Sequence, residues 1–123
     1  MTKKNKIKWL SELQEHDYAS ALSYLCLLCN KKTAKARVKE LKRAEMSQFR
    51  SKDIFRAARL PLLAVTNSHV KKDKQKIEAG EKISPLLLIR NPSKEKVVIA
   101  DGYHRLCAVY SFDEDAVIPC KIC

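Results

Sequence analysis

Glycine and proline are scarce in this chain of 123 residues, which contains two glycines and four prolines. Such low numbers exclude collagen-like, linker-like and low-complexity proteins. No apolar run approaches the roughly 20 residues needed to span a bilayer, and the basic start at residues 1–6 is not followed by the apolar stretch of a signal peptide. The sequence therefore predicts a soluble, cytoplasmic protein.

Aromatic residues are also few, with one Trp, four Tyr and three Phe and no run of them, so the sequence does not predict a stacking surface for single-stranded nucleic acid. The spacing of Cys26, Cys29, Cys120 and Cys123 resembles a four-cysteine zinc pattern. The first pair, however, lies in an apolar helical stretch, where cysteine acts as a small hydrophobe. For this reason we do not expect a zinc site. We do not expect a disulfide either, because cysteines of a cytoplasmic chain stay reduced.

Positive charge is what the sequence has in excess: 25 Lys and Arg against 14 Asp and Glu give a net charge of +11. Residues 1–60 hold fifteen basic and six acidic groups, and residues 61–123 hold ten and eight. A basic surface attracts polyanions, including nucleic acids and phosphorylated small molecules. Nucleic acid is thus a candidate partner of residues 1–60, although Lys-rich helices also serve simply as solvated faces.

The length and the apolar fraction of 46% are those of one domain with one core. We expect an α/β (α+β) fold in which residues 1–60 form a basic helical layer and residues 61–123 form a core with a small mixed sheet. The predicted strands of that core are residues 85–90, 96–100 and 117–122. Its predicted helices are residues 70–79 and 103–112.

Residues 7–59 read as helical throughout. Three helices are predicted, each with its own capping residue. Asp17 caps residues 18–29, Thr33 caps a second helix, and Ser51 caps residues 52–59. The first is apolar nearly all round, which predicts a buried central helix. The last two, with a break at residues 46–50, have the form of a helix-turn-helix, but helix pairs are common in any α-rich domain and both interpretations remain open.

The turn between the strand at 96–100 and the helix at 103–112 carries the most chemistry. Gly102 permits a tight turn, and the first turn of a helix has free N–H groups and a positive dipole end that suit an anion. His104 and Arg105 lie in that same turn, and Arg can grip a phosphate with two donors. A plain tight turn with Asp101 as the helix cap fits the same residues.

This turn, Asp101-Gly102-Tyr103-His104-Arg105, followed by a helix and an Ile-Pro-containing strand, resembles the ParB N-terminal/sulfiredoxin superfamily. The resemblance covers about residues 61–123. It implies a sulfiredoxin-like fold and a nucleotide, ATP or CTP, held by its phosphates, with Mg²⁺ as a bridging ion and Asp101 as the nearest carboxylate. The phosphate-binding residues that it implies are Gly102, Tyr103, His104 and Arg105, with a looser match at Asn67, Ser68, His69, Lys71 and Lys72.

One departure from the family matters: sulfiredoxins carry their catalytic cysteine where this chain has Tyr103, so that thiol chemistry is absent here. The resulting expectation is a nucleotide-binding module that contacts DNA through residues 1–60. The alternatives are a small phosphotransferase or nucleotide hydrolase with Asp101 or His69 as its base, and an interaction protein whose site has decayed. We expect an Arg105→Ala variant to lose ligand affinity while folding almost normally.

Overall fold

The computed structural model describes residues 7–123, so the basic start of the chain at residues 1–6 lies outside the described residues. The elements along the chain are β1 (Lys8–Trp9), α1 (Glu15–Leu28), α2 (Lys31–Arg43), β2 (Ser47–Arg50), α3 (Ser51–Ala58), α4 (Ser68–Glu78), β3 (Lys82–Ile83), β4 (Leu86–Asn91), the 3-10 turn η1 (Pro92–Lys94), β5 (Lys96–Asp101), α5 (Tyr103–Phe112) and β6 (Val117–Ile122).

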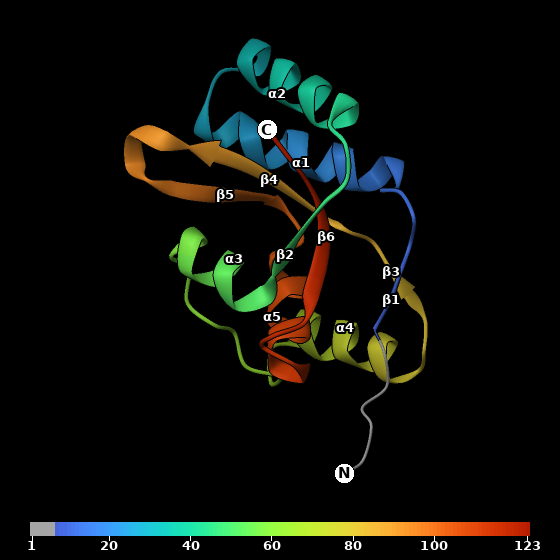
Figure 1. Ribbon diagram of the computed structural model, residues 1–123. Coiled ribbons are helices and arrows are strands. Elements are labelled where there is room, and N and C mark those ends of the chain that lie inside the picture. The colour runs from blue at the N-terminus through green and yellow to red at the C-terminus, as the bar shows by residue number, and fades with distance from the viewer. Residues whose placement is uncertain (1–6) are drawn as a thin grey trace.

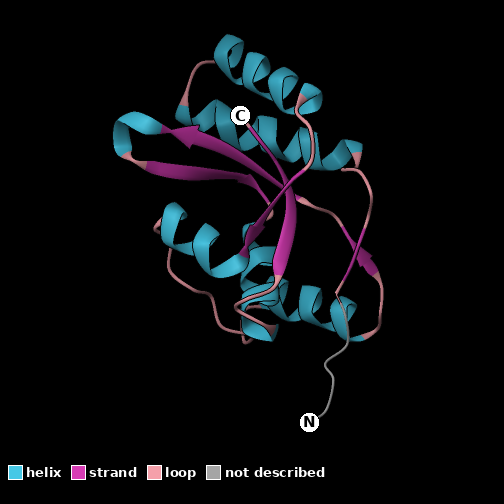
Figure 2. Cartoon of the chain, viewed as in Figure 1, coloured by secondary structure: helices cyan, strands magenta, loops and turns pink. Residues whose placement is uncertain are grey.

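The main sheet has four strands in the order β2-β6-β4-β5. Strands β4 and β6 are parallel, and the other two pairs are antiparallel. The short strands β1 and β3 form a separate parallel pair. This arrangement, with helices around the strands (Figure 2), confirms the predicted mixed α/β fold class.

The sheet lies between two helical layers (Figure 1): α1 and α2 cover one face, and α3, α4 and α5 cover the other. Each face has its own apolar core. Ala21, Leu25 and Leu41 pack on the sheet from the α1–α2 side, and Val70, Ile77 and Leu106 lie in the core of the other side. The start of α5 lies at the end of β5, so both layers approach this turn.

The prediction that residues 7–59 are entirely helical is wrong, because β1 and β2 interrupt them. Strand β2 pairs with the last strand, β6, along its whole length. The N-terminal segment therefore contributes to the central sheet, and residue 60 does not divide the molecule into a covering layer and a core. The helix-turn-helix interpretation is also wrong, since a strand of this sheet separates α2 from α3.

Helix α1 is a covering helix and not the buried central helix that its composition suggests. Leu27 and Leu28 are 82% and 55% exposed, whereas Tyr18 and Ala21 are buried. The helix begins one turn earlier than predicted, after Gln14, and the Asp17 carboxylate accepts a hydrogen bond from the Gln14 backbone N–H at 2.9 Å. Asp17 therefore lies inside the first turn and is not the residue before the helix.

Two other predicted caps are also corrected. Asn30 caps α2, and its side chain accepts the N–H of Thr33 at 2.8 Å. Ser51 is the first residue of α3, and its buried hydroxyl donates to the backbone carbonyls of Asp113 and Glu114. The Ser51 hydroxyl thus ties α3 to the loop before β6.

The second half of the chain agrees closely with the predicted elements. Helix α5 and strand β6 have the predicted bounds. Strand β4 is shifted by one residue, β5 is one residue longer, and α4 begins at Ser68 instead of residue 70. Residues 62–65 form a loop in which Leu62 and Val65 are exposed. Among the helices of residues 7–123, none is long and apolar enough to cross a bilayer.

Candidate functional site at the start of helix α5

The site is built where β5 ends and α5 begins. Gly102 adopts φ +108°, which lets the chain reverse within one residue. The Leu106 N–H donates to the Gly102 carbonyl and closes the first helical turn. No side chain caps this helix, so the predicted alternative of an Asp101 cap is not what the structure shows. The first amides of α5 are left free to bind an anion.

Arg105 points into the protein from the first turn of α5. Its Nη2 lies 3.1 Å from an Asp101 carboxylate oxygen and donates to the Pro85 carbonyl at 3.0 Å. Its Nη1 lies 3.9 Å from the carboxylate of Asp17 on α1. Only 16% of the Arg105 side chain is exposed. The guanidinium is therefore bound by the protein's own carboxylates, and a phosphate would have to displace one of them to reach it.

The cluster contains two carboxylates for one guanidinium. Burial, together with the smaller effect of the negative charge of Asp17, raises the pKa of Asp101 to about 6 and outweighs the opposing attraction of Arg105. At the ordinary pKa of an aspartate, near 4, this carboxyl would be fully ionised at pH 6. Half of the Asp101 side chains are thus protonated near pH 6.

This pKa predicts how the free energy of unfolding changes with pH. The folded protein binds a proton at Asp101 that the unfolded chain releases between pH 4 and pH 6, so the contribution of Asp101 to stability falls as the pH rises through this window. We expect Asp101→Asn to stabilise the protein at pH 7.5 relative to the wild type, and less so at pH 4.5. Urea unfolding of both proteins at the two pH values measures the difference; an equal effect at both would contradict it.

His104 faces His69 at the start of α4. The two imidazole rings are 4.8 Å apart between centroids and inclined at 37°. Partial burial lowers the pKa of His104, as does the neighbouring His69, while Asp73 on α4 has a smaller opposite effect. Burial in turn raises the pKa of Asp73. The structure thus brings together His69 and His104, which the sequence placed in two separate parts of the site.

Tyr103 is held beside His104, with 5.6 Å between ring centroids. Its hydroxyl donates to the Pro61 carbonyl, which fixes the loop after α3 against the turn. A cavity of about 360 Å³ opens between this loop, α1 and the turn. It is lined by Ser20, Tyr24, Leu60, Ile99, Ala100, Asp101, Gly102, Tyr103 and His104.

The remaining predicted residues do not line this cavity. The Asn67 side chain caps α4 by accepting the N–H groups of His69 and Val70. Ser68 and Lys72 are exposed on α4. Lys71 lines a different hollow, between α4 and the loop before it. Of the predicted second cluster, only His69 therefore lies next to His104.

Sequence reasoning missed three residues of α1 that belong to the site: Asp17, Ser20 and Tyr24. The resemblance covered only residues 61–123 and left α1 outside the site. One signal was present, since Asp17 precedes a largely apolar run of α1, and a carboxylate that packs among apolar residues needs a cation as partner.

Metal ligands are few around the cavity. No group of three or more His, Cys, Asp or Glu side chains converges anywhere in residues 7–123. Asp101 is the one carboxylate on the cavity wall among the described residues, and Arg105 already contacts it. The cavity wall thus offers one carboxylate for Mg²⁺, an ion that proteins commonly hold by one or two carboxylates together with the phosphates of a substrate.

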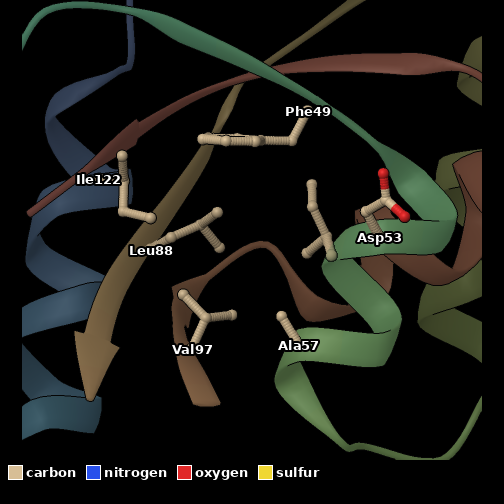
Figure 3. Close-up of a pocket in the computed structure, with 7 residues that line it drawn as sticks. Phe49, Asp53, Ala57, Leu88, Val97 and Ile122 are labelled. Carbon is tan, nitrogen blue, oxygen red and sulfur yellow. The ribbon is translucent and has the colours of Figure 1, made fainter. Parts of the chain in front are cut away.

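A second, smaller cavity of about 200 Å³ lies between α3 and the sheet (Figure 3). Its wall is formed by Phe49, Ile54, Ala57, Leu88, Val97 and Ile122, with the Asp53 carboxylate as its one charged group. None of the residues predicted from the sequence lies in this apolar cavity. The cavity at the start of α5 is therefore the candidate site.

Comparisons of this chain with family models, with curated proteins and with solved structures find no match. The resemblance to the ParB N-terminal/sulfiredoxin superfamily therefore depends on the residues of the turn and on the order of the elements around it.

Proposed function

We propose that the cavity at the start of α5 binds a nucleotide or a similar compound with a ring and a phosphate. One observation carries the proposal: the same cavity is bordered by the N-terminal amides of a helix and by two tyrosine side chains. The first feature suits a phosphate and the second suits a planar ring. The base of the nucleotide, adenine or cytosine, is left open.

The ring of the ligand would bind against Tyr24, Leu60 and Tyr103. Tyr24 and Leu60 are 42% and 41% exposed, so part of each side chain is open to a ligand. Tyr103 is fixed by its hydrogen bond to Pro61, so its ring is already oriented. A ligand ring between these side chains would bury apolar surface on both of its faces.

The phosphate would bind at the amides of Gly102, Tyr103 and His104, with the His104 imidazole as a further donor. Because Arg105 is bound to Asp101 and Asp17, we assign it a positioning role. It offsets part of the negative charge of Asp101 and Asp17 and holds the turn. Asp101 still carries negative charge at neutral pH, which opposes anion binding.

Calorimetric titration with ATP, CTP and pyrophosphate at pH 7.5 tests this assignment. We expect Asp101→Asn to raise the affinity for all three by about fivefold, because a like charge on the wall of the same cavity costs on the order of 1 kcal/mol after screening. Tyr24→Ala should weaken ATP and CTP but leave pyrophosphate unchanged. Asp113→Asn, in an exposed loop, removes the same charge elsewhere and serves as the control.

The proposal fails if none of the three compounds binds the wild type, which favours an interaction protein with a decayed site. It also fails if the ligands bind but respond equally to Asp101→Asn and Asp113→Asn, because the phosphate then lies elsewhere. Weaker binding of Asp101→Asn would instead indicate that the ligand is bound through a cation.

A phosphotransferase or hydrolase is the second candidate, favoured by the pKa of Asp101. A carboxyl with a pKa near 6 on the wall of a cavity has the protonation behaviour of a general base. His69 is the other candidate base, beside His104. Analysis of the titrated mixtures for ADP, CDP and free phosphate separates turnover from binding.

A further inference from the structure

Helix α2 carries an unusual concentration of positive charge. Seven of its thirteen residues are basic and one, Glu40, is acidic. Its buried residues are Ala34, Val38 and Leu41, which recur at helical spacing and pack on α1 and the sheet. The rest of its surface is exposed, so more than half of the chain's net charge of +11 is displayed on one helix.

Few of these charges are neutralised within the protein. Arg37 pairs with Glu40 at 3.3 Å, and Lys42 approaches Glu15 at 3.7 Å. In the described part of the chain, no ion pair is formed by Lys31, Lys32, Lys35, Lys39 or Arg43. The first turn of α2 has two lysines and no acidic residue, although the helix dipole favours the opposite arrangement there.

The position of α2 makes this surface accessible. The helix lies at the outer edge of the molecule, on the far side of the sheet from α4 and α5 (Figure 1). Lys35, Lys39 and Lys42 line a shallow groove along it. Side chains three and four residues apart lie about 5–6 Å from one another on a helix, so these ammonium groups form a row.

We propose that the exposed face of α2 binds the phosphate backbone of double-stranded DNA without reading its base sequence. An α-helix fits the major groove of B-DNA, which is about 12 Å wide. The row of lysines, of which Lys35 and Lys39 form no ion pair within residues 7–123, then contacts phosphates and releases their counterions, which supplies sequence-independent affinity. The exposed face has no Asn or Gln with which to recognise adenine.

Four other partners fit this face less well. Single-stranded nucleic acid binds by stacking on aromatic rings, and α2 has none. Peripheral membrane binding needs large apolar side chains along the same helix face as the basic ones; α2 exposes none, and the exposed Leu27 and Leu28 belong to the end of α1. Protein interfaces are depleted in lysine. Double-stranded RNA is excluded because its major groove is too narrow to admit a helix.

Fluorescence anisotropy with a labelled duplex of about 20 base pairs, at salt concentrations between about 50 and 200 mM, tests the proposal on the full chain. If about five phosphates are contacted, the affinity should fall about 500-fold over this range. The double variant Lys35→Gln/Lys39→Gln should bind at least about tenfold more weakly at low salt and lower the logarithmic salt slope by about 1.8. Glutamine keeps a good helix propensity, so α2 is retained.

The control is Lys94→Gln/Lys96→Gln, which removes the same charge from the β4–β5 hairpin. We expect its affinity to change less than about twofold, because charges beyond a Debye length are screened. Equal losses in the two double variants would overturn the proposal and leave only general attraction by net charge. Tighter binding of a single strand or of an RNA duplex, a strong preference between two unrelated sequences, or no binding at low salt would overturn it as well.

Discussion

An Arg105→Ala variant is expected to lose about 3–5 kcal/mol of folding free energy, the range measured when one partner of a buried ion pair is removed. The reason is Asp17, whose side chain is 2% exposed. Its ion-pair partners are the Arg105 guanidinium and the imidazole of His16, and the His16 side chain is exposed. Without Arg105, the buried Asp17 carboxylate loses its guanidinium partner, and the partly buried Asp101 carboxylate and the Pro85 carbonyl lose a donor. Urea unfolding followed by far-UV circular dichroism measures the loss.

Arg56→Ala is the matched control for this variant. Arg56 also pairs with an aspartate, Asp53 at 3.8 Å, but 85% of its side chain is exposed. Exposed pairs contribute roughly 0–1 kcal/mol, so the control should unfold almost as the wild type does. Similar stability of the two alanine variants would show that Asp17 and Asp101 do not depend on Arg105.

The expected instability reverses what the sequence suggested, namely that Arg105→Ala would fold almost normally. From the sequence, Arg105 is a cation in the first turn of a helix, where a dipole disfavours it, and a ligand is the obvious reason for its presence. The structure supplies another reason, because Asp17 lies beside it. That contact joins residues far apart in the chain, and no local pattern indicates it.

The elements that were predicted well share one property: their signals are local. Strand β5 is a short apolar run, Gly102 ends it, and α5 begins at once, so three neighbouring features agree on the turn. Strand β6 likewise begins after the acidic turn at residues 113–115. Where pattern, turn residue and length agree, the sequence determines the element without its tertiary context.

Strand β2 shows why the rest was missed. Its four residues, Ser47–Arg50, include one large apolar side chain, Phe49, so the sequence shows no alternation of apolar and polar residues, although their burial alternates in the structure. What makes them a strand is the edge of β6, more than sixty residues later. Helix α1 failed for a related reason, because composition could not show that Leu27 and Leu28 face away from the sheet.

A Gly102→Ala variant is the second change with a large expected effect, about 3 kcal/mol of folding free energy. Two costs add: an L-residue in the left-handed region costs about 1–2 kcal/mol, and an extra group in a packed core costs about 1–3 kcal/mol. A Cβ at Gly102 would lie 2.8 Å from Leu86 Cγ and 3.0 Å from Arg105 Nη2. Leu86 is fully buried and Arg105 is held by Asp101, so neither atom moves cheaply.

Gly80 separates the two costs, since it also has a positive φ, +76°, but a Cβ there would meet only Lys8 Nζ at 3.8 Å. Gly80→Ala should therefore cost about 1–2 kcal/mol, from the backbone alone. Urea unfolding of both variants gives the difference, which we assign to the contact of the turn with Leu86 and Arg105. Equal losses of folding free energy at the two glycines would mean that Leu86 and Arg105 move aside without cost. The amides of α5 would then lack the fixed geometry on which anion binding depends.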